Sequence, residues 1–452
     1  MASEWVEKSL GDVIDIKHGF AFKGEFFRDE PPGDALLTPG NFAIGGGFKA
    51  DKFKYYDGPV PDEFVLHEGD LLVTMTDLSK QADTLGYPAF VPRRNAGPRF
   101  LHNQRLGKII IKDKASLNIR YLHYLMCTRE YRHEVLASAT GTTVKHTSPE
   151  RIKRFRFLSP PLPEQRAIAR ILGTLDDKIE LNRRMNETLE AMARALFQSW
   201  FVDFDPVRAK AEGCDPGLPK EVADQFPGRF EDSERGEIPA GWGPVPLPQL
   251  IEVNPPRSLS KGQVAPYLDM ANMPTQGHSP DAVIERAFGS GMRFTNGDTL
   301  VARITPCLEN GKTAFVDFLE ESQIGWGSTE YIVLRPKPPL PPEYGYCLAR
   351  SVEFRDFAIQ SMTGSSGRQR VPAESLSHFA TASPPAYLAE LFGIRVKPLF
   401  ARVQTATKDS RTLAALRDTL LPKLISGELR VQDAQRFVDG VDSMDEVNSG
   451  RA

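Results

Sequence analysis

Two short stretches of the sequence combine a glycine, hydroxyl side chains and cations in the same order. They are TGTTVKH (140–146) and TGSSGRQR (363–370). In such a segment, backbone N–H groups and hydroxyls can donate hydrogen bonds to a phosphate while the cation neutralises its charge. Arginine and glutamine can also read base edges in the major groove. DNA contact is therefore predicted for Thr142, Thr143, Lys145 and His146 in the first stretch, and for Ser365, Arg368, Gln369 and Arg370 in the second.

Further cations lie close to these stretches in each half of the chain. Residues 91–105, VPRRNAGPRFLHNQR, add Arg93, Arg94, Arg99 and Arg105 around an expected turn, and the second half adds Arg303 and Lys312. A solvated basic face is the alternative interpretation of any one such cluster. The recurrence of the same loop in both halves favours a binding role, and we include these residues as candidate DNA contacts.

Catalytic motifs are weak or missing. NPPR (254–257) is similar to the motif of amino-methyltransferases, but its fourth residue is Arg257 rather than an aromatic that could stack on a flipped base. PCLENGKT (306–313) ends like a phosphate-binding loop, yet Pro306 replaces the first glycine and removes a backbone N–H. The four cysteines are far apart, with no C-x-x-C pair, which argues against a zinc site. We expect no catalytic residue and no metal in this chain.

Composition limits the class of protein. The 452 residues are 40% hydrophobic and 25% charged, with a formal net charge of −3, so any basic surface must be local. The first residues lack the layout of a signal peptide, and no apolar run approaches the ~20 residues of a membrane span. We expect a soluble, cytoplasmic protein without a membrane partner.

A long internal repeat must position the candidate loops. WVEKSLGDVIDI (5–16) recurs as WGPVPLPQLIEV (242–253), and EGDLLVTMT (68–76) recurs as NGDTLVARI (296–304). Gly141 then matches Gly364, in the same order along the chain. Short alternating runs predict strands in the middle of each copy, and helical spacing follows late in each copy. The chain is interpreted as a tandem duplication of an α+β domain.

Each copy is followed by a long helical stretch with apolar residues at heptad spacing. One such helix alone could lie on its own domain, but two matched helices favour pairing with each other as an antiparallel coiled coil. A helix from Glu164 to Trp200 would span ~55 Å, equivalent to about 16 base pairs. Pro398 is expected to interrupt the first turns of the second helix. The predicted spacer residues are Leu175, Ile179, Asn182, Leu189 and Leu196 in the first helix, and Leu399, Val403, Leu413 and Leu420 in the second.

These patterns predict six segments along the chain. They are a first α+β domain (1–159), a first long helix (160–205), a linker (206–240), a second α+β domain (241–384), a second long helix (385–430) and a flexible tail (431–452); the resemblance described next identifies the two domains as target-recognition domains.

Nearly the whole chain resembles the specificity subunit of type I restriction-modification systems. The most specific stretches are PLPEQRAIARILGTLDDKIELNRRMNETLEAMARALFQSWFVDF (161–204), GEIPAGW (236–242) and LRDTLLPKLISGEL (416–429). The resemblance implies two domains that each read one half of a split double-stranded DNA sequence, separated by the coiled coil. It also implies a non-catalytic chain that docks two methyltransferase (modification) subunits and ATP-dependent restriction subunits. S-adenosylmethionine, ATP and magnesium would then be used by the partners, with no cofactor in this chain.

Two other classes of function are alternatives. An autonomous methyltransferase-nuclease is disfavoured by the missing cofactor and catalytic motifs. A two-domain protein-interaction scaffold without DNA specificity is disfavoured by the repeated basic loops.

Overall fold

The computed structural model describes residues 5–435 except 51, 80, 95–96, 234–235 and 366. Most of the tail predicted over 431–452 therefore lies outside the described residues. The chain divides into two compact units, one made of Met1–Lys178 with Thr412–Ala452 and the other of Ile179–Arg411. We refer to them as unit 1 and unit 2.

Two sheets build the core of unit 1. The first is antiparallel, in the order β2 (Ile14–His18), β11 (Leu106–Ile111), β7 (Leu71–Thr74) and β9 (Pro88–Phe90). The second has the order β3 (Phe27–Arg28), β5 (Lys54–Tyr56), β4 (Asp34–Leu37), β10 (Phe100–His102) and β6 (Val65–Leu66). Strand β7 is buried along its whole length, because apolar side chains meet it on both faces of the sheet.

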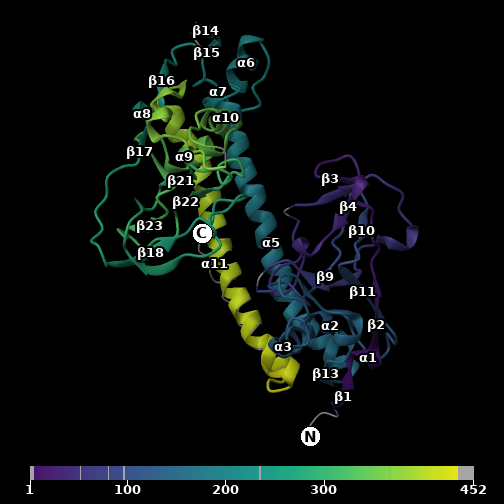
Figure 1. The fold of residues 1–452 in the computed structure, drawn as a ribbon. Coiled ribbons are helices and arrows are strands. Elements are labelled where there is room, and N and C mark those ends of the chain that lie inside the picture. Colours follow the sequence, from purple (N-terminus) through teal and green to yellow (C-terminus); the bar gives the residue numbers. More distant parts are fainter. Residues whose placement is uncertain are drawn as a thin grey trace. The chain divides into compact units, whose positions relative to one another are not determined.

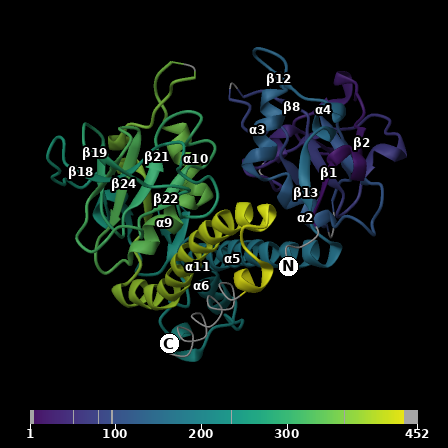
Figure 2. The ribbon, with the colours of Figure 1, turned by 90° about the horizontal axis from the view of Figure 1, so that it is seen from below.

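Short two-stranded ribbons and α-helices complete the domain of unit 1, and several of them are labelled in Figure 2. The ribbons pair β1 (Val6–Ser9) with β13 (Arg156–Ser159), and β8 (Thr76–Asp77) with β12 (Lys145–His146). The helices are α1 (Leu10–Val13), α2 (Ile119–Leu125), α3 (Arg129–Ala137) and α4 (Pro149–Lys153). Each begins where a side chain, from Ser9, Asn118, Thr128 or Ser148, accepts a hydrogen bond from a backbone N–H of the first turn.

Unit 2 repeats this topology. Its first sheet has the order β17 (Ile251–Val253), β24 (Tyr331–Pro336), β21 (Thr299–Ala302) and β22 (Thr313–Phe315). Its second sheet has the order β19 (Ile284–Ala287), β18 (Val264–Leu268), β23 (Gly325–Gly327) and β20 (Met292–Phe294). A ribbon pairs β16 (Pro244–Pro246) with β25 (Ala380–Ala382), and the helices are α8 (Leu247–Leu250), α9 (Pro342–Arg350) and α10 (Val352–Gln360).

Strand pairing supports the repeat at the level of register. The parallel pair β10–β4 in unit 1 corresponds to the parallel pair β23–β18 in unit 2. Leu106 lies opposite Thr74, as Tyr331 lies opposite Ala302. The predicted α+β tandem repeat is confirmed.

The segment before the second domain packs on unit 2. It contains α6 (Asp205–Ala211), α7 (Lys220–Ala223) and a hairpin of β14 (Phe230–Ser233) with β15 (Gly236–Pro239). Phe226 and Trp242 are buried, and the ring of Phe226 lies 5.2 Å from that of Trp200. The aromatic contacts explain why a segment rich in glycine, proline and charge is ordered here.

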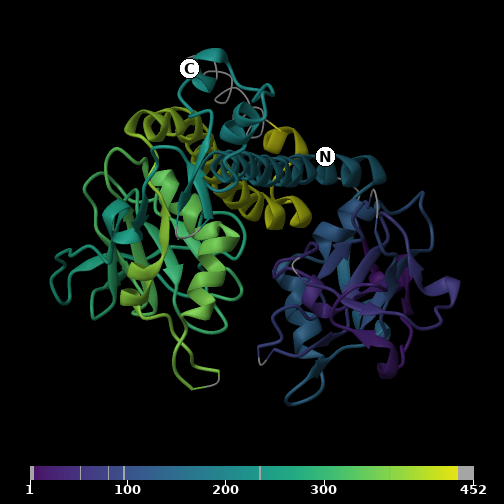
Figure 3. The same cartoon turned by 90° about the horizontal axis from the view of Figure 1, so that it is seen from above.

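The two long helices are α5 (Leu162–Phe201), of 40 residues, and α11 (Ala386–Ser426), of 41 residues (Figure 1). Within unit 2 they run antiparallel (Figure 3), since the Asn182 amide donates to Ser410 Oγ at 3.2 Å and the Asn186 amide donates to Thr407 Oγ1 at 3.2 Å. Within unit 1, Arg417 Nη1 lies 2.8 Å from Asp176 Oδ1. The predicted coiled coil is confirmed.

The predicted spacer residues lie along this helix pair. Leu175, Val403, Leu413 and Leu420 are buried, and Ile179, Asn182, Leu189, Leu196 and Leu399 are half-buried. The Asn182 amide also donates to the carbonyl of Ala406. Polar mid-seam residues therefore find partners on the opposite helix, which is how such residues fix register.

The expectation that Pro398 interrupts the second helix is wrong, because α11 is continuous from Ala386 to Ser426. Leu388, Phe392 and Val396 are fully buried in the core of unit 2 and hold the turns that precede the proline. Pro398 itself is exposed, so its missing N–H leaves a carbonyl one turn back facing the solvent side of the helix. Packing outweighs the local cost of the proline.

Among the described residues, no helix is both long and apolar enough to span a membrane.

Candidate nucleic-acid interface

The loop TGTTVKH is a tight hairpin end on unit 1. Thr140 and His146 exchange backbone hydrogen bonds of 2.9 and 2.8 Å, and β12 pairs with β8 through Lys145 and Asp77. Gly141 has φ +97°, and a Cβ there would lie 1.9 Å from the carbonyl oxygen of Val144. The glycine is therefore required by the turn. Figure 2 shows β8 and β12 on the side of unit 1 away from α5.

Unit 2 builds the same loop from a different sequence. Thr363 and Arg370 exchange backbone hydrogen bonds of 2.9 Å each, Arg370 also bridges Ile304, and Gly364 has φ +118°. The loop projects from unit 2 on the side away from α11, in light green in Figures 2 and 3. Each unit thus presents one glycine-hydroxyl-cation loop, as the sequence predicts.

The side chains of the first loop remain accessible. Thr142, Thr143 and His146 are exposed, and Lys145 is half-buried. His146 Nδ1 lies 3.1 Å from Thr76 Oγ1. Hydroxyls and a lysine on an exposed hairpin end form a suitable phosphate contact.

The second loop carries more cations, but one of them is paired. Ser365 and Arg368 are exposed, and Gln369 is half-buried. Arg370 forms a bidentate ion pair with Glu330, in which Nη2 lies 2.8 Å and Nε 2.9 Å from the carboxylate. The hydrogen bond to Glu330, followed by its charge, raises the pKa of Arg370. Arg370 is the least available cation of this loop.

Beside each loop lies a second turn of identical geometry. In unit 1, the backbone N–H of Arg105 donates to Asn103 Oδ1 at 2.9 Å, and the carbonyl of Arg105 accepts from Met75 at 2.9 Å. In unit 2, the N–H of Glu330 donates to Ser328 Oγ at 3.0 Å, and its carbonyl accepts from Arg303 at 2.9 Å. Glu330 therefore occupies the position of Arg105.

The remaining candidates are placed less favourably. Arg99 pairs with Asp34 at 2.6 Å, at the opposite end of β10 from Arg105. Arg94 donates to the carbonyl of Pro98 and lies 4.4 Å above the Phe100 ring. Arg93 is exposed on the same connection. These three arginines do not join the cluster formed by Arg105 and the TGTTVKH loop.

In unit 2, the ammonium of Lys312 donates to the carbonyls of Met270 and Ala271. Its charge therefore holds a neighbouring loop. Arg303 has a buried Nε without a hydrogen-bond partner among the described residues. DNA contact by any of the candidate residues stays a prediction.

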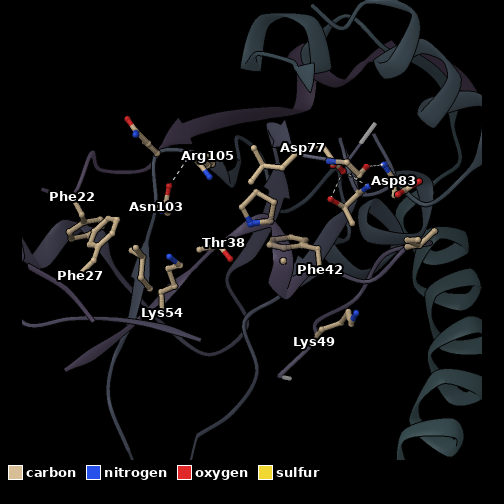
Figure 4. A pocket seen from close by; sticks show the side chains of 18 residues that line it. Phe22, Phe27, Thr38, Phe42, Lys49, Lys54, Asp77, Asp83, Asn103 and Arg105 are labelled. Atoms are coloured by element: carbon tan, nitrogen blue, oxygen red, sulfur yellow. Dashed lines mark hydrogen bonds between the residues drawn. The ribbon is translucent and has the colours of Figure 1, made fainter. Parts of the chain in front are cut away.

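A hollow beside the Arg105 turn was not expected from the sequence. It has a volume of about 640 Å³ and is lined by residues from four separate segments, within 22–27, 36–54, 77–84 and 103–105 (Figure 4). In that view Phe22 and Phe27 lie on one side, and Asp77 and Asp83 on the other. The polar lining residues include Thr38, Lys49, Lys54, Asn103, Gln104 and Arg105. The run NQR at 103–105 was the available signal, since three polar residues at a turn can face a ligand together.

No group of histidine, cysteine, aspartate and glutamate within the described part of the chain could hold a metal ion. The buried Asp77 uses its oxygens for internal hydrogen bonds from Ser79 N–H and Thr84 Oγ1, each at 2.6 Å. Burial would raise the pKa of Asp77, but these hydrogen bonds outweigh it and hold the pKa below its ordinary value.

Each unit thus contains one copy of the same α+β domain, with a loop of glycine, hydroxyl and basic residues. Comparisons with known proteins agree. Residues 2–191 match the family described as type I restriction modification DNA specificity domain. The resemblance to type I specificity subunits is confirmed, and residues 2–191 form a domain of that family.

Relatives extend this likeness over the chain. The HindI specificity subunit of Haemophilus influenzae is 23% identical over 94% of this chain and 100% of its own length. The MjaIX specificity subunit of Methanocaldococcus jannaschii is 26% identical over 73% of each chain. The solved S subunit of a type I system from M. genitalium shares the fold, with a TM-score of 0.52 over 94% of this chain and 96% of that one, at 16% identity.

Proposed function

We propose that this chain is the DNA-specificity subunit of a type I restriction-modification complex, with one unit reading each half of a split duplex sequence. The observation that carries the proposal is the pair of matched loops. The same hairpin end and the same neighbouring turn occur in both units, while their side chains differ. A conserved scaffold with diverged polar side chains suits two readers of different half-sites.

The chemistry belongs to partner subunits. We propose that this chain docks two methyltransferase subunits and ATP-dependent restriction subunits, which would use S-adenosylmethionine, ATP and magnesium. The chain itself contributes binding and register only, and it works in the cytoplasm, where cellular DNA lies. Purified alone, it is expected neither to methylate nor to cleave DNA. Methyl transfer by the isolated, uncontaminated chain would contradict this division of labour.

Mapping methylated adenines in a host that expresses this chain with its methyltransferase subunit tests the function. We expect a motif of two short specific sequences separated by a fixed gap, which disappears when this chain is omitted. A continuous motif, or methylation that does not depend on this chain, would contradict the proposal.

Duplex binding separates the DNA reader from a protein-interaction scaffold. A reader that contacts phosphates loses affinity steeply with salt, with a slope of about −0.9 per phosphate in a plot of log K against log salt concentration. A complex that shows no salt-dependent duplex binding would favour the scaffold.

A further inference from the structure

The hollow of unit 1 combines features that phosphate contact does not need. Its rim carries two large apolar side chains in open solvent, Ile44 and Leu78, which are 71% and 61% exposed. The cations Lys54 and Arg105 line the same hollow. Large apolar side chains are poorly solvated by water, and their exposure beside cations is typical of a binding surface. The composition therefore indicates a partner that has both apolar groups and hydrogen-bond acceptors.

The turn 103–105 sets the polar side of the hollow. The Asn103 side chain accepts from the Arg105 N–H, which fixes the turn, and the dashed line in Figure 4 marks this bond. Gln104 and Arg105 then project from a rigid turn, both exposed. Among the described residues, neither the Gln104 amide nor the Arg105 guanidinium has a side-chain hydrogen bond within the protein. Their donors are therefore available to a ligand.

Strand β8 connects the hollow to the TGTTVKH loop. Asp77 of β8 lines the hollow, and β8 pairs with Lys145 and His146 of the loop. A duplex whose backbone rests on this loop would therefore have the hollow beside it.

The second copy supplies an independent argument. Its turn has the same hydrogen bonds but carries Ser328, Thr329 and Glu330 in place of Asn103, Gln104 and Arg105. Side chains that differ at identical backbone positions are what two half-sites of different sequence require.

We propose that the turn 103–105, with the hollow beside it, reads base edges of the first half-site in the major groove. The Gln104 amide suits the N6 and N7 groups of adenine, the Arg105 guanidinium suits O6 and N7 of guanine, and Ile44 and Leu78 suit the methyl group of thymine. Thr329 holds the corresponding position toward the second half-site. This inference rests on the proposed function and names the residues that carry it out.

The test is selection of duplexes from a random library by this chain in complex with its methyltransferase subunit, followed by sequencing. The variants are Gln104→Ala, Arg105→Ala and Arg105→Lys, with Lys114→Ala as the control. Lys114 is also exposed, and it lies beyond the far end of β11 from Arg105. Arg105→Lys keeps the charge and loses the two-pronged hydrogen bonding.

We expect each of the three variants to lose preference at one position of one half-site, by about 5- to 150-fold for a bidentate contact. The other half-site and the Lys114→Ala motif should be unchanged. Thr329→Ala should loosen the opposite half-site. Unchanged preferences in the Gln104 and Arg105 variants, or loss of all duplex binding, would overturn the inference. If the wild-type complex selects no split sequence, the proposed function itself fails.

Discussion

His278 of unit 2 is a titratable side chain that is fully buried between two carboxylates. Its Nδ1 lies 2.9 Å from Glu190 Oε1 on α5, and its Nε2 lies 3.0 Å from Asp317 Oδ2. The hydroxyl of Tyr346 donates to the other oxygen of Glu190 at 2.8 Å, and the ring of Phe400 on α11 stacks on the imidazole. One histidine thus joins the domain to both long helices.

Burial alone would lower the pKa of His278, but hydrogen bonds to Asp317 and Glu190, with their charges, outweigh burial and raise it to about 9. The folded pKa lies above the ordinary value, so the stabilisation is complete below about pH 6.5 and is lost as pH rises through about 9. His278→Gln removes the cation and leaves two buried carboxylates uncompensated. We expect it to lower the free energy of unfolding at about pH 6 by roughly 3 kcal/mol or more.

Urea unfolding between about pH 6 and pH 9 measures this effect. The wild-type free energy of unfolding should fall over that range, and the fall should be much smaller in His278→Gln. The exposed His133→Gln is the control and should follow the wild type. A His278→Gln variant with wild-type stability at about pH 6 would show that the imidazole is neutral in the folded protein.

The charge of Glu330 also holds the Arg370 guanidinium in an ion pair, which limits its availability to a phosphate group. Glu330→Gln removes the partner of Arg370 and frees a guanidinium beside the basic loop. We expect tighter duplex binding at low salt, and a plot of log K against log salt concentration that is steeper by up to about 0.9, one phosphate contact. Glu321→Gln, an exposed substitution elsewhere in unit 2, should leave the slope unchanged. An unchanged slope in Glu330→Gln would remove Arg370 from the interface.

At the scale of elements, the first turn of α5 is anchored by one buried amide. Gln165 is 0% exposed. Its Oε1 accepts from the Asn118 N–H at 2.9 Å, and its Nε2 donates to the carbonyls of Ser116 and Pro160 at 3.1 and 2.9 Å. Trp5 Nε1 also donates to the neighbouring Glu164 at 3.0 Å. The PEQ run at the start of α5 therefore locks the helix to the domain of unit 1.

Truncation of this anchor should be costly. Gln165→Ala strips a buried N–H and two buried carbonyls of their partner, and we expect a loss of about 3 kcal/mol in the free energy of unfolding of unit 1. Gln198→Ala on the same helix is the control, because the hydrogen bonds of Gln198 lie at the surface. Differential scanning calorimetry of both variants measures the loss. Equal melting temperatures would show that the amide network contributes nothing.

The repeat and the helix pair could be predicted because they are periodic along the chain, and periodicity is visible without contacts. Whether a single charged side chain is free or ion-paired could not be predicted in this way. Arg99 and Arg370 look like free cations in sequence, yet their partners Asp34 and Glu330 lie 65 and 40 residues away. The hollow draws Thr38, Lys54 and Asn103 from segments that meet only through the sheet. The continuity of α11 through Pro398 could not be predicted because it depends on the tertiary burial of Leu388, Phe392 and Val396.

Lengthening both long helices should lengthen the gap between the two halves of the recognised DNA sequence. Seven residues inserted between Ile179 and Leu189, and seven between Val403 and Leu413, keep the heptad seam in phase. They add ~10.5 Å, about 3 base pairs of DNA rise. Three base pairs also turn one half-site by roughly 100° about the DNA axis, so affinity should fall.

The measurement is methylation of a random-spacer library by the complex that carries both insertions. Sites still methylated should keep both half-sequences with a gap longer by about 3 base pairs. A matched insertion of three residues in each helix is the control, because it breaks the seam and should abolish methylation. An unchanged gap with activity retained would mean that the helices do not set the separation.

At the scale of the whole molecule, duplication gives the chain two domains with one architecture. Each unit repeats the four-stranded antiparallel sheet, and strands β5, β4, β10 and β6 of unit 1 correspond in order to β19, β18, β23 and β20 of unit 2. The hairpin loop and the neighbouring turn also recur. The side chains at the tips have diverged, with Arg105 in one copy where Glu330 stands in the other. Because each domain has its own buried core, we expect that one domain can be exchanged without unfolding the other.

Exchange of one domain tests the central claim most directly. Residues 241–384 are replaced by the corresponding domain of a relative that recognises a different split sequence, and methylated adenines are then mapped in a host that expresses the chimera with its methyltransferase subunit. The account predicts a motif in which one half becomes that of the donor while the other half stays that of the parent. A change in both halves, or in neither, would contradict the assignment of one half-site to each domain.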